Sequence, residues 1–93
     1  MTTHLRQLPQ RRQDVELRDS GYQSVLVTPS GSTYALNPTA RAIWELCDGA
    51  TTVDELAEAI SAVFVVDHDA AIRDVAATIE QLQAADLVST SSS

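Results

Sequence analysis

The chain has 93 residues, of which 44% are hydrophobic and 4% aromatic, and its formal net charge is −7. This length makes one domain at most, whose core rests on Val, Ile, Leu and Ala with Trp44 as the largest side chain. Cys47 is the only cysteine, which excludes an internal disulfide bond. No apolar run approaches the roughly 20 residues of a membrane span, and residues 1–13 lack the apolar segment of a signal peptide. We therefore expect a cytoplasmic protein.

The charge is unevenly distributed along the chain. Residues 1–40 carry four Arg and three acidic residues, whereas residues 41–93 carry two Arg and ten acidic residues. An acidic surface repels phosphate groups. We therefore expect neither nucleic acid nor a membrane among the partners.

The first half of the chain predicts a small antiparallel sheet. Residues 15–18 alternate apolar and polar side chains, residues 22–28 are rich in β-prone side chains, and residues 33–36 form a third short β-prone run. Turn-forming segments at 19–21 and 29–32 separate these runs. Three strands joined by short turns form a meander.

A first helix is predicted over residues 38–47. Asn37 is a favourable N-cap, and Pro38 takes the first helical position, where its missing N–H costs nothing. Gly49 supplies the left-handed residue that ends the helix.

Two further helices follow. Thr52 and Glu55 predict a capping box at the start of a helix over 53–65. Residues 67–69 break the apolar pattern and can cap a third helix over 70–85. The helical apolar faces predicted to form the core are Ala40, Ile43, Trp44 and Cys47, then Val53, Leu56, Ala57, Ile60, Val63 and Phe64, then Ile72, Val75, Ala76, Ile79 and Leu82. Leu36, in the third predicted strand, is also assigned to the core.

Strands followed by helices indicate an α+β domain. The expected fold is winged helix-turn-helix-like, with a three-stranded antiparallel sheet followed by three helices. The domain is expected to cover residues 14–88, between a flexible N-terminal arm at 1–13 and a disordered tail at 89–93. Residues 87–88 are expected to add a short extended piece before the tail.

Each candidate for chemistry has a simpler structural interpretation. Cys47 lies at the C-terminal end of a helix, where the dipole disfavours a thiolate, so we expect a core residue. Residues 67–69 are adjacent and do not converge on a metal without a further ligand. Ser20, within 19–21, faintly resembles the phosphopantetheine attachment site of carrier proteins, but the triplet joins two strands and is expected to be a turn. We therefore expect a noncatalytic protein with no metal and no cofactor.

The backbone is the most available binding resource of such a domain. A three-stranded sheet has two edges, and each edge can accept an extended peptide as an added strand. A second copy of the chain could pair with the same edge, which would form a homodimer.

The middle of the chain carries the series Tyr34-x-Leu36-Asn37-x-Thr39-Ala40-x-x-Ile43-Trp44-x-Leu46-Cys47-Asp48-Gly49-x-x-Thr52-Val53-x-x-Leu56-Ala57. This series resembles the PqqD-like proteins, which are the peptide-recognition domains of ribosomal peptide maturation (RiPP recognition elements). The resemblance continues through Asp74-Val75-x-x-x-Ile79-x-x-Leu82 and Asp86-Leu87-Val88, and covers residues 14–88. Asp86 departs from it, because the family usually has glycine there to end the third helix.

The resemblance implies a domain that binds the leader segment of a precursor peptide and presents the core segment to a separate modifying enzyme. Leader peptidases, cyclases and radical-SAM enzymes all work with such domains, in lasso-peptide, pyrroloquinoline-quinone-type and other pathways. It also implies that the leader adds to the third strand and lies against the third helix. Thr33, Tyr34 and Ala35 would then offer backbone groups to the leader.

The third helix has two flanks beside its buried stripe, and periodicity does not choose between them. One flank holds Ala71, Asp74, Thr78 and Ala85, and the other holds Arg73, Ala77, Glu80 and Ala84. Asp74 belongs to the matching series, which favours the first flank. The predicted peptide-binding residues of this helix are Ala71, Asp74, Val75 and Thr78, although Tyr34 and Val75 also suit the core. The acidic helical half would suit a leader that carries Lys or Arg.

The alternative interpretation is a winged-helix regulator that binds DNA. Its recognition helix would be the third helix, over 70–85, where Arg73 is the only cation. DNA-reading helices normally carry several Lys or Arg residues, so the sequence disfavours this alternative.

Overall fold

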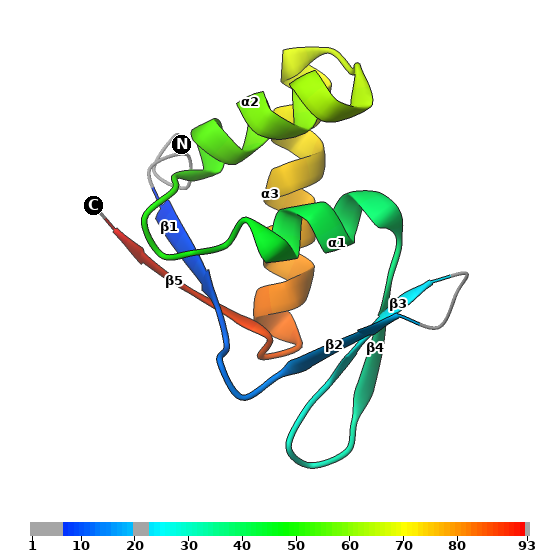
Figure 1. Cartoon of the computed structure of the whole chain (residues 1–93). Coiled ribbons are helices and arrows are strands. Elements are labelled where there is room, and N and C mark those ends of the chain that lie inside the picture. Colours follow the sequence, from blue (N-terminus) through cyan, green and yellow to red (C-terminus); the bar gives the residue numbers. More distant parts are fainter. Residues whose placement is uncertain (1–6, 20–22, 93) are drawn as a thin grey trace.

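The predicted antiparallel meander is confirmed. The computed structural model describes residues 7–19 and 23–92 (Figure 1). Its sheet runs in the order β2-β3-β4, formed by β2 (Glu16–Asp19), β3 (Ser24–Val27) and β4 (Thr33–Leu36). The turn predicted at 19–21 lies mostly outside the described residues.

A tight turn joins β3 to β4. The N–H of Thr28 donates to the carbonyl oxygen of Ser32 at 2.9 Å, and the N–H of Gly31 donates to the carbonyl oxygen of Thr28 at 2.9 Å. Gly31 has a φ of 89°, in the region that glycine adopts without a steric penalty.

The three predicted helices are also confirmed, with shifted ends. They are α1 (Pro38–Glu45), α2 (Val53–Phe64) and α3 (His68–Ala84). Asn37 caps α1, because its Oδ1 accepts a hydrogen bond from the N–H of Ala40 at 2.7 Å. Asp67 is the N-cap of α3, so this helix begins two residues earlier than the predicted position 70.

The link between α1 and α2 is fixed by local polar contacts. Gly49 has a φ of 78°, which confirms the predicted left-handed residue after α1. Asp48 accepts a hydrogen bond from the N–H of Ala50 at 2.9 Å, and this bond lowers the pKa of its carboxyl group. The capping box of α2 is complete: Thr52 Oγ1 accepts from the N–H of Glu55 at 3.1 Å, and Glu55 Oε1 accepts from the N–H of Thr52 at 2.9 Å.

One hydrophobic core joins the sheet to the three helices. Full burial of one such aliphatic side chain contributes roughly 1.5–3 kcal/mol. Most of the predicted positions are buried, Leu36 among them, and Val15, Leu26, Ala71, Leu87 and Val88 join them. Four predicted positions are half-buried: Ala40, Phe64, Ile72 and Ala76. Val63 is exposed, at 70%, because its side chain lies at the edge of the apolar stripe in the last turn of α2.

The expected flexible arm and disordered tail are wrong over the residues that the structure describes. Gln7–Arg11 forms β1 and Val88–Ser92 forms β5, and the two strands pair as an antiparallel ribbon (Figure 1). The parts of these two expectations at residues 1–6 and 93 lie outside the description.

The ribbon forms because each of its strands satisfies the backbone of the other. It is attached to the domain through β1, whose Pro9 is fully buried. The N–H of Arg11 donates to the carbonyl oxygen of Cys47 at 2.9 Å, and the N–H of Gly49 donates to the carbonyl oxygen of Pro9 at 3.0 Å. Polar side chains can form such a strand because the stabilising contacts are made by main-chain groups.

Over residues 7–19 and 23–92, none of the helices has the length and apolar character needed to cross a membrane.

Candidate functional site

The outer edge of β4 is the main candidate site. Within the described residues, β2 and β4 each pair with β3 alone, so each leaves one edge without a strand. Three of the four residues of β2 are charged, whereas β4 has the uncharged sequence TYAL. Charged side chains discourage strand addition at an edge, so β4 is the better acceptor.

The register of the sheet shows which residues of β4 can bind an added strand. Tyr34 pairs with Leu26 and Thr33 pairs with Val27. The next pair toward the turn is Thr28 with Ser32, and the N–H of Thr28 donates to the carbonyl oxygen of Ser32. Along an antiparallel ladder, hydrogen-bonded pairs alternate with pairs that are not hydrogen-bonded. Tyr34 therefore bonds to β3, while the N–H and C=O groups of Thr33 and Ala35 point outward.

This geometry corrects the expected role of Tyr34. Its backbone faces β3, so it offers no main-chain group to a peptide at the outer edge. Its side chain is half-buried and packs against the core, whereas Thr33 and Ala35 are exposed. Thr33 and Ala35 therefore remain the two candidate backbone partners for an added strand.

Two of the predicted residues on α3 are also corrected. Ala71 and Val75 are both 0% exposed, in the same buried stripe as Leu82. Their side chains pack between elements of the core and cannot contact a bound peptide in this structure. Asp74 is exposed and Thr78 is half-buried, so both remain accessible.

The surroundings of α3 distinguish its two flanks. On one side, Glu80 lines a hollow together with Gln7 and Val53, and Gln83 Nε2 donates to Thr90 Oγ1 of β5 at 3.3 Å. This side faces the β1–β5 ribbon. Asp74, Thr78 and Ala85 lie on the other side of the buried stripe.

A cavity of about 390 Å³ lies between the end of α3 and the β3–β4 turn. Its lining residues are Arg12, Asp14, Thr28, Pro29, Ser30, Ser32, Ala85 and Asp86. Ala85 belongs to the flank of α3 that carries Thr78, and Ser32 directly precedes Thr33. The cavity therefore lies at the turn end of β4, beside this flank.

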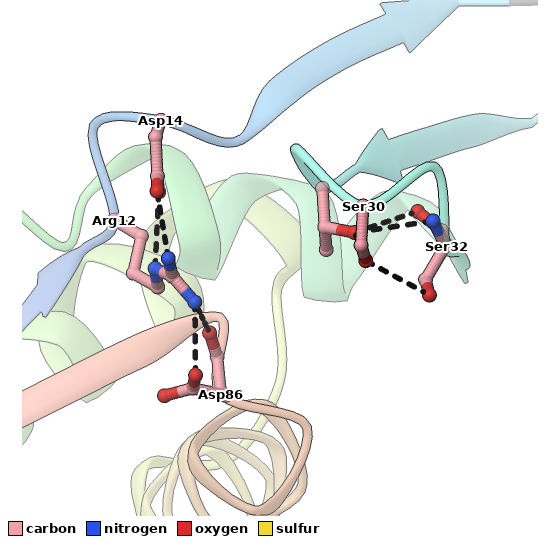
Figure 2. A network of polar contacts seen from close by, with 6 residues as sticks. Arg12, Asp14, Ser30, Ser32 and Asp86 are labelled. Carbon is pink, nitrogen blue, oxygen red and sulfur yellow. Dashed lines mark hydrogen bonds and ion pairs between the residues drawn. The ribbon is translucent and has the colours of Figure 1, made fainter.

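Arg12 joins Asp14 and Asp86 into one wall of this cavity (Figure 2). Its Nε and Nη2 donate to the two carboxylate oxygens of Asp14 at 3.0 and 2.7 Å, and Nη1 donates to Asp86 Oδ2 at 2.9 Å and to the Asp86 carbonyl oxygen at 3.1 Å. The hydrogen bond to Asp14 raises the pKa of Arg12 above its ordinary value. On the opposite wall, the hydroxyl groups of Ser30 and Ser32 lie 3.4 Å apart.

A larger cavity of about 500 Å³ lies at the other end of β4, beside Leu36 and Pro38. Arg41 lines it and donates from Nη1 to Asp19 at 2.6 Å and to the buried Ser24 hydroxyl at 3.2 Å.

The structure offers little for catalysis over the described residues. Cys47 is fully buried, and this burial raises the pKa of its thiol to about 12, which confirms the predicted core role. Within the same residues, no three His, Cys, Asp or Glu side chains gather as a metal site. Sequence reasoning missed the wall formed by Arg12 and Asp14, whose only signal was the departure from glycine at Asp86.

Three solved structures have a similar fold. Lasso peptide synthetase B1 complexed with the leader peptide matches with a TM-score of 0.75 and 23% identity, over 88% of this chain and 98% of that chain. TbiB1 in complex with the TbiA(beta) leader peptide matches with a TM-score of 0.71 and 22% identity, over 85% of this chain and 93% of that chain. At these identities the likeness establishes the fold alone.

The third structure is the PqqD truncation of Methylobacterium extorquens PqqCD, described as a functional, stand-alone RiPP recognition element. It matches with a TM-score of 0.73 and 24% identity, over 87% of each chain. Among curated proteins, no sequence matches this chain. The family described as coenzyme PQQ synthesis protein D (PqqD) matches residues 23–88, which is more than half of the chain. The protein therefore belongs to the PqqD family, as its central sequence predicts.

Proposed function

We propose that this protein binds the leader segment of a ribosomally made precursor peptide and presents the precursor to a separate modifying enzyme. The leader adds as a strand to the outer edge of β4. The observation that carries this proposal is the outward-facing backbone of Thr33 and Ala35, at the end of β4 where Ser32 and Ala85 line one cavity. Membership of the PqqD family supports it, as do two similarly folded proteins that were solved with leader peptides.

Backbone bonds alone do not give useful affinity. Thr33 and Ala35 offer two donors and two acceptors, and each hydrogen bond contributes about 0.5–1.5 kcal/mol net. Micromolar binding requires about 8 kcal/mol. Side chains must supply the remainder and the selectivity, and the available ones are Asp74 and Thr78 on α3 and Ala85 at its C-cap.

The protein acts as an adaptor in this proposal, and the chemistry belongs to its partner enzyme. A leader peptidase, a cyclase or a radical-SAM enzyme would serve. The buried Cys47, with its raised pKa, is unsuited to nucleophilic attack. DNA binding is disfavoured because Arg73 is the only Arg or Lys of α3, which also carries three exposed acidic residues, Asp69, Asp74 and Glu80.

Substitution of Ala35 by proline tests the proposal directly. Proline removes the outward N–H of this residue and is tolerated on an edge strand. We expect Ala35→Pro to keep the fold and to weaken leader binding at least about tenfold, since one bond is lost and the approach is blocked. The matched control, Ala35→Val, keeps the N–H and should bind nearly as the parent does.

The ligand for this test is the leader segment of a precursor peptide, to be sought in the open reading frames that flank this chain's gene. Titration into ¹⁵N-labelled protein should shift the amide signals of Thr33 and Ala35. Unchanged signals at these residues, or equal affinity for Ala35→Pro and Ala35→Val, would exclude strand addition at β4. Sedimentation without ligand should also report whether this edge pairs two copies of the chain, and added leader should then dissociate that dimer.

A further inference from the structure

The cavity at the end of α3 is lined by hydrogen-bond acceptors that strand addition does not use. Arg12 directs its bonds to Asp14 and Asp86, so its donors are largely occupied by the cavity's own carboxylates. Two carboxylates against one guanidinium leave a net negative charge. Asp86 Oδ1 has no partner among the described residues, and the side chain of Asp86 is 87% exposed.

The opposite wall also offers acceptors. Thr28, Ser30 and Ser32 present hydroxyl groups, and the Thr28 and Ser30 hydroxyl oxygens lie 2.9 Å apart. Thr28 Oγ1 already accepts from the N–H of Ser32 at 3.1 Å. The hydroxyl oxygens of Ser30 and Ser32 each have two lone pairs and can accept a further bond. Charged and neutral acceptors on both walls suit a ligand group that is cationic and rich in donors.

The backbone of Asp86 holds a conformation that favours glycine over a residue with a side chain. Asp86 has a φ of 60°, in the left-handed region where glycine is unstrained. A residue with a Cβ is strained there, although Asp is strained less than most because its side chain bonds locally. Asp86 in place of glycine adds a carboxylate to the lining of the cavity.

The cavity also continues the path of the proposed leader. Ser32, in its wall, directly precedes Thr33, whose backbone faces outward. An added strand rises about 3.3 Å per residue. Opposite residues of a ladder share a face, so the residue opposite Ser32, on the face of Tyr34 and Leu36, would place a long side chain at the mouth of the cavity.

We propose that this cavity binds a Lys or Arg side chain of the leader, with Asp86 and Asp14 as its counter-charges. This inference rests on the proposed function, because it takes the leader to lie along β4. It adds a position-specific charge requirement that strand pairing alone does not impose.

A double-mutant cycle tests the inference. Asp86→Asn removes the charge, retains a residue that tolerates the left-handed conformation, and keeps an oxygen that can accept from Arg12. We expect Asp86→Asn and replacement of one basic leader residue by Gln each to weaken binding about tenfold, as loss of a charge-assisted bond does. The two changes together should weaken binding no more than either alone. The matched control Glu80→Gln removes a charge on the other flank and should leave affinity unchanged.

The outcomes separate the two proposals. If the leader shifts the Thr33 and Ala35 amides but no basic leader residue couples to Asp86, the cavity assignment is wrong while strand addition stands. If the leader does not bind at all, the proposed function is wrong.

A small probe tests the cavity without any leader. N-acetyl-arginine amide should give saturable amide shifts at Ser30, Ser32 and Asp86 in ¹⁵N-labelled protein, and the Asp86→Asn variant should lose them. The neutral isostere N-acetyl-citrulline amide should give none. Equal responses to the two probes, or no response to either, would overturn the assignment.

Discussion

Arg11 lies over the ring of Trp44, with the guanidinium carbon 5.7 Å from the ring centroid. Its Nη1 also donates to the carbonyl oxygen of Glu45 at 2.8 Å and to that of Cys47 at 3.4 Å. Helix α1 has no basic residue in its last turn, so a strand from the start of the chain supplies the cation that a helix C-terminus favours. This contact joins the β1–β5 ribbon to the core.

We expect Arg11→Ala to lower the free energy of unfolding by about 1–2 kcal/mol, because it removes a cation–π contact and a hydrogen bond to an exposed helix end. Arg11→Lys keeps the charge and should lose less. Urea unfolding followed by the fluorescence of Trp44, the only tryptophan, measures both variants. Equal stability of Arg11→Ala and the parent would show that the ribbon is held by main-chain pairing alone.

Because the thiol of Cys47 is buried, we expect the free energy of unfolding to fall at alkaline pH. Burial raises the pKa of this thiol from 9.0 to about 12, so the folded state retains a proton that the unfolded state releases. The stabilisation is complete below pH 9 and is lost as the pH rises toward 12, with a slope of up to about 1.4 kcal/mol per pH unit. Cys47→Ala removes this titration, so the stability difference between the parent and this variant should shrink from pH 8 to pH 11. A constant difference in urea unfolding would contradict the prediction.

Val65 predicts a stabilising substitution. This β-branched residue ends α2 with a φ of 53°, and its side chain is 89% exposed. We expect Val65→Gly to raise the free energy of unfolding by about 1 kcal/mol, since glycine adopts the left-handed conformation without strain. In a domain of this size that corresponds to a rise in Tm of about 4–8 °C. The control Val63→Gly lies inside the helix and should instead lower Tm.

Thr78 reports which side of α3 contacts the leader. We expect Thr78→Arg to weaken leader binding at least about tenfold, because a bulky side chain would occupy the flank beside β4. Ala84→Arg places the same side chain at an exposed position on the other flank and should leave affinity unchanged. Calorimetric titration of both variants with the leader distinguishes the flanks. The reverse pattern would mean that the peptide lies against the side of α3 that faces the ribbon.

Sequence reasoning found the elements whose signals are local. Asn37 with Pro38, and Thr52 with Glu55, fix two helix starts through contacts within four residues, so their chemistry can be read directly from the chain. The three-stranded meander follows for the same reason, because short turns join its strands.

The ribbon was missed because its information is not local. Gln7 pairs with Ser92 and Arg11 with Val88, across almost the whole length of the chain. Neither strand shows hydrophobic alternation, since the ladder is held by main-chain groups and by the buried Pro9. Ala71 and Val75 were assigned to the site for a related reason. Periodicity locates an apolar stripe on a helix, but it does not show how much of the surface beside that stripe the neighbouring elements bury.

The ribbon places residues 7 and 92 opposite each other. A short connecting loop between these two positions would therefore turn the most distant pairing in the sequence into a simple hairpin. New ends could then be opened at the exposed residue Val65, where the backbone is left-handed. Such a circular permutant would retain the outer edge of β4 and shorten the average sequence distance between contacting residues, which usually speeds folding.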